Sequence, residues 1–121
     1  MIKFVPVSSE NLSGQFKNCE NIFGYIGYDL SADSVECGKC VFRLRGYEMD
    51  ILSVEVYDSD PETAEGLIRS ALNYGANRSA YMAYYRADSA LETAETLGFE
   101  KDKDGILSGD IPSLLKGSCC K

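Results

Sequence analysis

The clearest strand pattern in the chain lies in residues 49–57, which read Met-Asp-Ile-Leu-Ser-Val-Glu-Val-Tyr. β-branched residues dominate this segment and its side chains alternate between two faces, as they do in a sheet. One face carries Ile51, Ser53, Glu55 and Tyr57, and the other carries Leu52, Val54 and Val56. A shorter apolar run at 40–44 is ended by Gly46. We predict that the two segments pair as an antiparallel hairpin.

The clearest helix pattern follows this strand. Asp60 offers a capping side chain, Pro61 stands where a helix needs no amide donor, and Glu62 places negative charge at the positive end of the helix dipole. Apolar residues then recur at spacings of three and four and define one buried face, made of Ala64, Leu67, Ile68, Ala71 and Leu72. Gly75 is placed to end this helix.

The remaining segments give weaker patterns. Apolar residues between Leu12 and Ile26 recur at helical spacing, while Asn, Gly and Ser interrupt them. Before residue 40 we therefore predict a strand at 2–7, a helix with irregular breaks across 9–28 and a polar loop at 29–38. After the central helix we predict strands at 79–85, 99–101 and 106–108, a helix at 90–97 ended by Gly98, and a closing helical turn at 111–115.

The order of these elements predicts the fold class. Strands interleaved with helices, together with a hairpin, imply an α/β (α+β) domain with a mixed, mostly antiparallel central sheet flanked by helices. No linker rich in Pro, Gly or Ser and no repeat divides the chain. A length of 121 residues suits one domain, so we expect residues 1–121 to fold as a single unit.

Composition and charge narrow the chemistry. The sequence has no histidine, which excludes Ser-His-Asp and Cys-His catalytic systems and imidazole metal ligands. The formal net charge is −7, from 19 acidic and 12 basic residues. This balance opposes binding to nucleic acid and to anionic membranes, whose phosphates need a basic surface. A cationic amine substrate or a protein partner is favoured instead.

The chain ends and the cysteines predict the compartment. The sequence turns polar at Ser8 and holds no apolar run long enough for a signal peptide or a membrane span, so we expect a cytoplasmic protein whose cysteines are thiols. Cys37 and Cys40 have the spacing of a zinc knuckle, and Cys119 and Cys120 offer two further thiolates. A plain turn at 37–40 with exposed tail thiols is the simpler interpretation, and we predict no metal site.

Three local patterns resemble the GNAT superfamily of acetyl-CoA-dependent N-acyltransferases. Residues 4–12, Phe-Val-Pro-Val-Ser-Ser-Glu-Asn-Leu, are similar to the opening strand and helix start of the family. The strand at 51–57, followed by a helix containing Ser70-Ala71-Leu72, resembles its central strand and cofactor-binding helix. Residues 94–100, Ala-Glu-Thr-Leu-Gly-Phe-Glu, resemble the helix end and Leu-Gly-Phe that precede its last strands. The resemblance is continuous from about residue 49 to residue 108.

The resemblance implies a cofactor and a set of site residues. Acetyl-CoA or another acyl-CoA is expected beside the central strand, with backbone groups at Val54 and Val56 pairing with its pantetheine arm. Glu55 lies on the strand from which many family members draw a general base, and Tyr84 is the candidate phenol. Gly66 and Arg69 are the candidates for contacts with the cofactor phosphates.

The same comparison shows departures from the family pattern. The family holds the cofactor pyrophosphate on an Arg/Gln-x-x-Gly-x-Gly/Ala loop, but the three aligned positions are Ala64, Leu67 and Arg69, and Gly66 is offset by one. Carboxylates at 58, 60 and 62 repel a polyphosphate. Ala94 stands where the family often has a tyrosine acid. The alternative function is therefore a catalytically inactive domain that binds a protein or small ligand.

Each candidate residue also has a structural interpretation. Glu55 shares a strand face with Ser53 and Tyr57, which is typical of a polar sheet face that meets solvent. Tyr84 belongs to an aromatic run at 81–85, which is typical of strand packing. Arg69 and Arg86 offer phosphate ligands in place of the missing loop, although single arginines are usually solvated.

Overall fold

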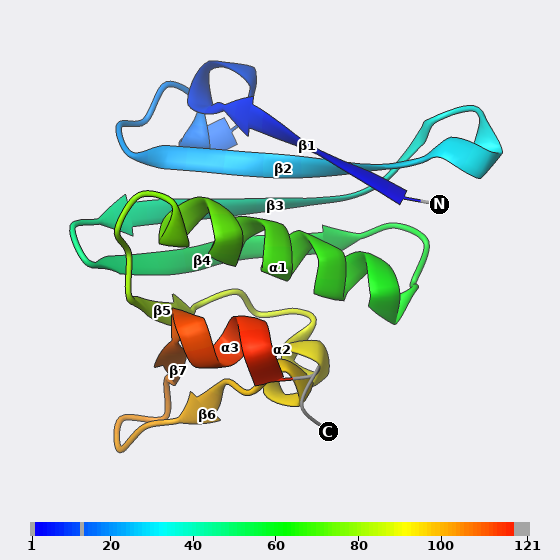
Figure 1. The fold of residues 1–121 in the computed structure, drawn as a ribbon. Helices are drawn as coiled ribbons and strands as arrows, with labels where there is room; N and C mark the ends of the chain where they lie inside the picture. The colour runs from blue at the N-terminus through cyan, green and yellow to red at the C-terminus, as the bar shows by residue number, and fades with distance from the viewer. Residues whose placement is uncertain (1, 13, 118–121) are drawn as a thin grey trace.

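The computed structural model describes residues 2–12 and 14–117, which form one seven-stranded sheet and three α-helices (Figure 1). The strands are β1 (Ile2–Ser8), β2 (Ile22–Asp29), β3 (Val35–Arg45), β4 (Glu48–Val56), β5 (Met82–Tyr85), β6 (Glu100–Lys101) and β7 (Leu107–Asp110). The α-helices are α1 (Pro61–Ala76), α2 (Leu91–Leu97) and α3 (Ile111–Gly117). Short 3-10 turns are η1 (Ser9–Asn11), η2 (Gly14–Phe16) and η3 (Leu30–Ala32).

The sheet has the strand order β1-β2-β3-β4-β5-β7-β6. All neighbouring strands are antiparallel except β4 and β5, which run parallel and are joined by α1. The predicted mixed, mostly antiparallel sheet with flanking helices is therefore confirmed. The hairpin of β3 and β4 is also confirmed, with Arg45 paired to Glu48 next to its turn.

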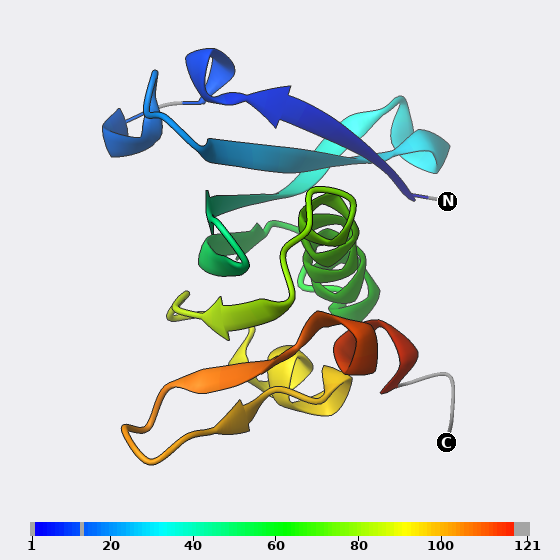
Figure 2. The ribbon, with the colours of Figure 1, turned by 60° about the vertical axis from the view of Figure 1, so that its left-hand side comes forward.

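The helices all lie on one face of the sheet (Figure 2). Side chains from α1, α2 and α3 share one core with the same face of β3, β4 and β5, and the fully buried members include Phe42, Ile51, Ile68, Leu97 and Ile111. The opposite face carries no α-helix in the described part of the chain. A small cluster of Leu12, Ile22 and Val41 is buried there beneath η1 and η2. We call this side the open face.

The prediction of a broken helix across 9–28 was wrong, because the segment forms two 3-10 turns and then β2. Glycine occurs in this segment because neighbouring strands pack closely there. A Cβ at Gly24 would lie 2.7 Å from the carbonyl oxygen of Cys40, so glycine lets β2 approach β3. Ile22 and Phe23 belong to the clusters on opposite sides of the sheet, and this two-sided burial produced the apparent helical spacing.

The predicted loop at 29–38 is also too long, because β3 begins at Val35. Residues 37–40 therefore lie within a strand and do not form a turn. Gly38 is buried, and a Cβ there would lie 2.8 Å from the carbonyl oxygen of Glu55. Like Gly24, it serves close strand packing, so its presence was not a turn signal.

Helix α1 begins at Pro61 as predicted but continues through Gly75 to Ala76. A Cβ at Gly75 would lie 2.5 Å from Sδ of Met49, so this glycine allows the helix to approach β4 and does not end it. Gly98 does cap α2, where its N–H group donates to the Ala94 and Glu95 carbonyls, and α3 covers the predicted turn at 111–115.

The simple alternation predicted for β4 is broken by a register shift. Val41 pairs with Ser53 while Phe42 pairs with Ile51, so Leu52 is left between the two pairs as a β-bulge. Ile51 and Val54 consequently both point into the helix-covered core. Within the described residues, no helix is long and apolar enough to cross a membrane.

Candidate functional site

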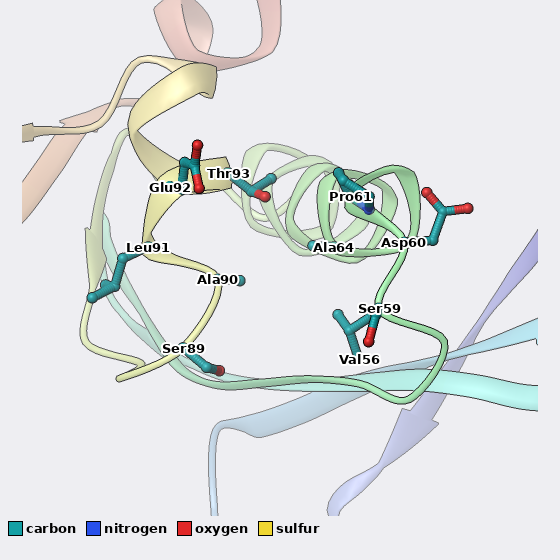
Figure 3. A pocket seen from close by; sticks show the side chains of 10 residues that line it. All are labelled: Val56, Ser59, Asp60, Pro61, Ala64, Ser89, Ala90, Leu91, Glu92 and Thr93. Carbon is teal, nitrogen blue, oxygen red and sulfur yellow. The ribbon is translucent and has the colours of Figure 1, made fainter.

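A cavity lies where β4 and β5 part. The two strands pair only from Glu48 and Met82 to Ile51 and Tyr85, and the Arg86 N–H group makes the last bond, 2.8 Å to the Ile51 carbonyl. β4 continues to Val56, and beyond the pairing a cavity of about 490 Å³ opens between β4, the start of α1 and the start of α2 (Figure 3). Its lining is Val56, Ser59, Asp60, Pro61, Ala64, Ser89, Ala90, Leu91, Glu92 and Thr93.

The first turn of α1 faces this cavity with its backbone donors already bonded. Pro61 has no N–H group, Glu62 donates to Oδ1 of Asp60 at 2.9 Å, and Thr63 donates to the Asp60 carbonyl at 3.0 Å. The Ala64 N–H group donates to the same carbonyl at 3.4 Å. An anion at this helix end would therefore find no unbonded donor among the first four residues, although helix N-termini commonly bind phosphates through such groups.

Asp58 also occupies hydrogen-bond donors at the start of α1. Asp58 accepts bonds from the Asp60 N–H group at 3.0 Å and from the Thr63 hydroxyl at 2.9 Å. In Figure 3 the carboxylate of Asp60 lies on the far side of Pro61 from Ala90. Of these two carboxylates, only Asp60 lines the cavity, and it lies at its edge.

Ser89 bridges the two sides of the cavity. Its hydroxyl donates to the Val54 carbonyl on β4, and its own carbonyl accepts a bond of 2.7 Å from the Tyr85 hydroxyl. Burial raises the pKa of Tyr85 well above its ordinary value, so the phenol keeps its proton and this bond. No pattern in the sequence identified Ser89, because a serine beside an aspartate is typical of an ordinary loop.

Glu55 lies on the open face near the end of β4. It is exposed, and its Oε2 lies 3.7 Å from Nζ of Lys39 on β3. Together with Phe16 and Val41 these two residues line a second, smaller cavity of about 210 Å³. Glu55 is therefore available to solvent and to a ligand on this face, which matches the prediction of a polar face.

Tyr84 lies on β5, also on the open face, but it points toward the start of β4. Its hydroxyl donates to Oε2 of Glu48 at 2.9 Å, and this bond, with a smaller contribution from burial, raises the pKa of the phenol. Tyr84 pairs with Asp50, whereas Glu55 lies five residues farther along β4, beyond the β-bulge at Leu52. The structure does not bring the two predicted catalytic residues together.

The predicted cofactor contacts divide into two groups. Val56 lines the cavity and the Val54 carbonyl meets Ser89 at its edge. Gly66 is outside the cavity and packs against the Phe4 ring. Arg69 is also outside it, where it bonds Glu65 at 3.1 Å and the Leu115 carbonyl at 3.1 Å. Arg86, the other candidate phosphate ligand, pairs with Asp50 on the open face.

The cysteines form no site in the described structure. Cys37 and Cys40 are both buried in β3, and the Cys40 thiol donates to the Leu67 carbonyl at 3.6 Å. Burial raises the pKa of Cys40 to about 12, so it stays a protonated, unreactive thiol. No group of three or more potential metal ligands occurs in residues 2–12 and 14–117. Cys119 and Cys120 lie outside the described residues.

Comparisons with known proteins identify similar folds. The sequence matches no protein-family profile, and no curated protein matches it. The structure is similar to the ribosomal-protein-S18-alanine N-acetyltransferase from Escherichia coli, with a TM-score of 0.68 and 11% identity over 92% of this chain and 94% of that chain. It is also similar to the spermidine/spermine N-acetyltransferase SpeG from Vibrio cholerae, with a TM-score of 0.70 and 12% identity over 98% and 99%.

A third similar structure was solved with coenzyme A bound. PaiA N-acetyltransferase from Thermoplasma acidophilum, solved in complex with coenzyme A, has a TM-score of 0.61 and 12% identity, covering 74% of this chain and 61% of that chain. At these low identities the likeness establishes the arrangement of the elements. The chemistry has to be argued from the site itself.

Proposed function

We propose that this chain, which has the fold of the GNAT superfamily, transfers an acyl group from acetyl-CoA or another acyl-CoA to an amine. The observation that carries this proposal is the cavity at the parting of β4 and β5. Its volume of about 490 Å³ falls within the range of small-molecule sites, and one wall is the β4 segment whose backbone the resemblance assigns to the pantetheine arm.

The residues that line the cavity fit the pantetheine arm of an acyl-CoA but not its diphosphate. Val56, Pro61 and Ala64 give the cavity an apolar wall, and the Val54 carbonyl offers an acceptor to an amide of the arm once the Ser89 hydroxyl rotates away. The diphosphate finds no such fit at the start of α1, because the helix donors are bonded to Asp60. The proposed mode of binding therefore uses the arm and the acyl group.

The chain supplies groups for proton transfer on the open face. When bound, an acyl-CoA supplies a thioester carbonyl that an amine can attack. Glu55 is the proposed proton acceptor, because it is an exposed carboxylate on the strand that borders the cavity. The phenol of Tyr84 keeps its proton and is the proposed donor. Their separation along the sheet means that each has to be tested independently.

The bonded helix end favours a second candidate function. If acyl-CoA does not bind, the domain is a GNAT-like module that binds a protein or small ligand without chemistry. A cytoplasmic location and a protein partner remain predictions under either function.

Calorimetric titration with acetyl-CoA tests the first proposal. We expect saturable binding in the micromolar range, and we expect Thr93→Trp to abolish it because the larger ring fills the cavity. Thr96→Trp is the matched control, since it places the same ring one turn later on α2, outside the cavity lining. Absence of heat at millimolar acetyl-CoA, or equal binding by the two variants, would overturn the proposal.

A further inference from the structure

Three arginines converge on one buried carboxylate on the open face. Asp50 has a fully buried side chain, with 0% exposure, and its two oxygens accept five N–H contacts. Arg45 approaches at 2.6 and 3.1 Å, Arg86 at 2.7 Å, and Arg43 at 3.0 and 3.3 Å. We call Arg43, Arg45, Arg86 and Asp50 the arginine cluster.

The arginine cluster contains more positive charge than the carboxylate needs. Glu48 adds a second negative charge, since it accepts from Arg45 at 3.0 Å and from the Tyr84 hydroxyl at 2.9 Å. Three guanidinium groups against two carboxylates leave a local surplus of +1, in a chain whose net charge is −7. Two guanidinium groups would balance these two carboxylates, so one positive charge of the cluster is left without a negative partner.

Several guanidinium N–H donors of the cluster are not used by Asp50. Arg86 uses only its Nε atom, and Arg43 uses Nε and Nη2, so both Nη groups of Arg86 and Nη1 of Arg43 have no hydrogen-bond partner in the described part of the chain. Their side chains are 38% and 43% exposed. Both residues bond the same carboxylate on the open face, so their free donors are partly exposed on that face.

The guanidinium groups are also held in place. Asp50 fixes all three of them, and Arg45 and Arg86 lie over the Tyr84 ring with Cζ at 5.8 and 5.4 Å from its centroid. Fixed arginines lose little conformational entropy when they bind, and their planar donor pairs match carboxylate and phosphate oxygens. A rigid, partly exposed set of unpaired donors is suited to binding an oxyanion.

We propose that the arginine cluster is an oxyanion-binding site that holds a carboxylate or phosphate group of a small-molecule ligand through Arg43 and Arg86. The site is on the open face, beside the point where β4 and β5 part, since Arg86 makes the last bond between these strands. It is separate from the cavity that we assign to the acyl donor, and its existence does not depend on acyl transfer.

Titrations with inorganic phosphate and with glutarate, each at constant ionic strength, test the site. Binding is followed by the NMR shifts of the arginine Nε–H groups. We expect a saturable shift of the Arg43 and Arg86 signals, and Arg86→Gln should weaken binding by about tenfold because it removes one charge and the free donors. Arg78→Gln is the matched control, since Arg78 is exposed and stacks on Tyr74 at 3.6 Å, outside the arginine cluster.

A second variant keeps the test decisive if Arg86→Gln does not fold. Arg43→Gln removes the other proposed ligand while Arg45 and Arg86 still bond Asp50, so we expect it also to weaken phosphate or glutarate binding by about tenfold. Saturation by phosphate alone or by glutarate alone identifies the group that is recognised. No saturable shift in the wild type, or weakening by Arg78→Gln equal to that by Arg86→Gln and Arg43→Gln, overturns the proposal.

Discussion

The carboxylate of Asp50 is held in its charged form although its side chain is fully buried. Burial alone would raise its pKa, but hydrogen bonds from Arg45, Arg86 and Arg43 outweigh that effect and lower the pKa to about 2. The charged form is thus the one that the folded state stabilises. Since the pKa is lower in the folded chain than in the unfolded one, this group contributes stability at neutral pH that acid removes.

The pH dependence of unfolding tests this role of Asp50. The contribution is complete above the ordinary aspartate pKa of 3.8 and is lost as the pH falls from about 4 to about 2. It amounts to roughly 2 kcal/mol, after allowance for solvent around the three guanidinium groups. We expect denaturant titrations to show that the stability gap between the wild type and Asp50→Asn shrinks by this amount over that interval. A gap that stays constant would contradict the assignment. Glu10→Gln, which removes an exposed carboxylate from η1, is the control.

At the scale of elements, the close contact of α1 with β4 depends on Gly75. Gly75→Ala adds a methyl group 2.5 Å from Sδ of Met49, which is itself fully buried. Overpacking costs about 1–3 kcal/mol, whereas alanine gains only about 1 kcal/mol in helix propensity. We therefore expect a net loss of unfolding free energy, measured by chemical denaturation. Asn73→Ala, at an exposed position in the same turn, should be neutral or slightly stabilising. A gain in stability at Gly75→Ala would show that Met49 moves freely.

The cap of α1 links helix stability to the proposed binding of acetyl-CoA. Asp60→Asn keeps a capping side chain and removes the charge at the cavity rim, so we expect unchanged stability and acetyl-CoA binding tighter by about threefold. Asp60→Ala removes the cap as well and should cost about 1 kcal/mol of stability. Thermal unfolding and calorimetry measure the two effects separately. Equal affinity in the wild type and both variants would mean that the acyl donor does not approach this helix end.

The elements that the sequence predicted well are those with local signals. The start of α1 follows from Asp60 and Pro61, and the end of α2 follows from Gly98. β2 was missed because its identity depends on pairing with β1 and β3, and because Gly24 is a packing residue whose reason lies in Cys40. Local patterns thus predict helix ends better than they predict strands whose two faces are both covered.

The candidate functional sites were harder to predict from local sequence patterns than the helices and strands. The resemblance predicted a cofactor contact at Val56, which lines the cavity, but Ser89 and the arginine cluster as a whole had no signal within a single segment. The cluster joins residues 43, 45, 50 and 86, which all meet only when β5 pairs with β4. Neither the three arginines nor Asp50 form a pattern in the sequence, so the site becomes visible only in the folded chain.

At the scale of the whole molecule, one acidic group and one basic group of side chains lie on different sides of the sheet. Acidic residues at 58, 60 and 62 surround the start of α1 on the helix-covered face, whereas the open face holds the positive arginine cluster. The overall charge of −7 suggested a cationic amine, but a purely cationic acceptor would be repelled by the arginines. If the proposed acyl transfer and the oxyanion site both hold, the acceptor is an amine that also carries a carboxylate or phosphate group.

A pair of acceptors that differ by one carboxylate tests this inference. We expect lysine to be acetylated with a kcat/KM about tenfold higher than that of 1,5-diaminopentane, which lacks only the carboxylate, because the arginine cluster holds that group. Arg86→Gln should bring the two values together by lowering the value for lysine, while Arg78→Gln leaves the ratio unchanged. A preference for the diamine in the wild type would contradict the inference. Acetylation of neither compound, together with saturable phosphate or glutarate binding, would retain the oxyanion site and count against the acyltransferase proposal.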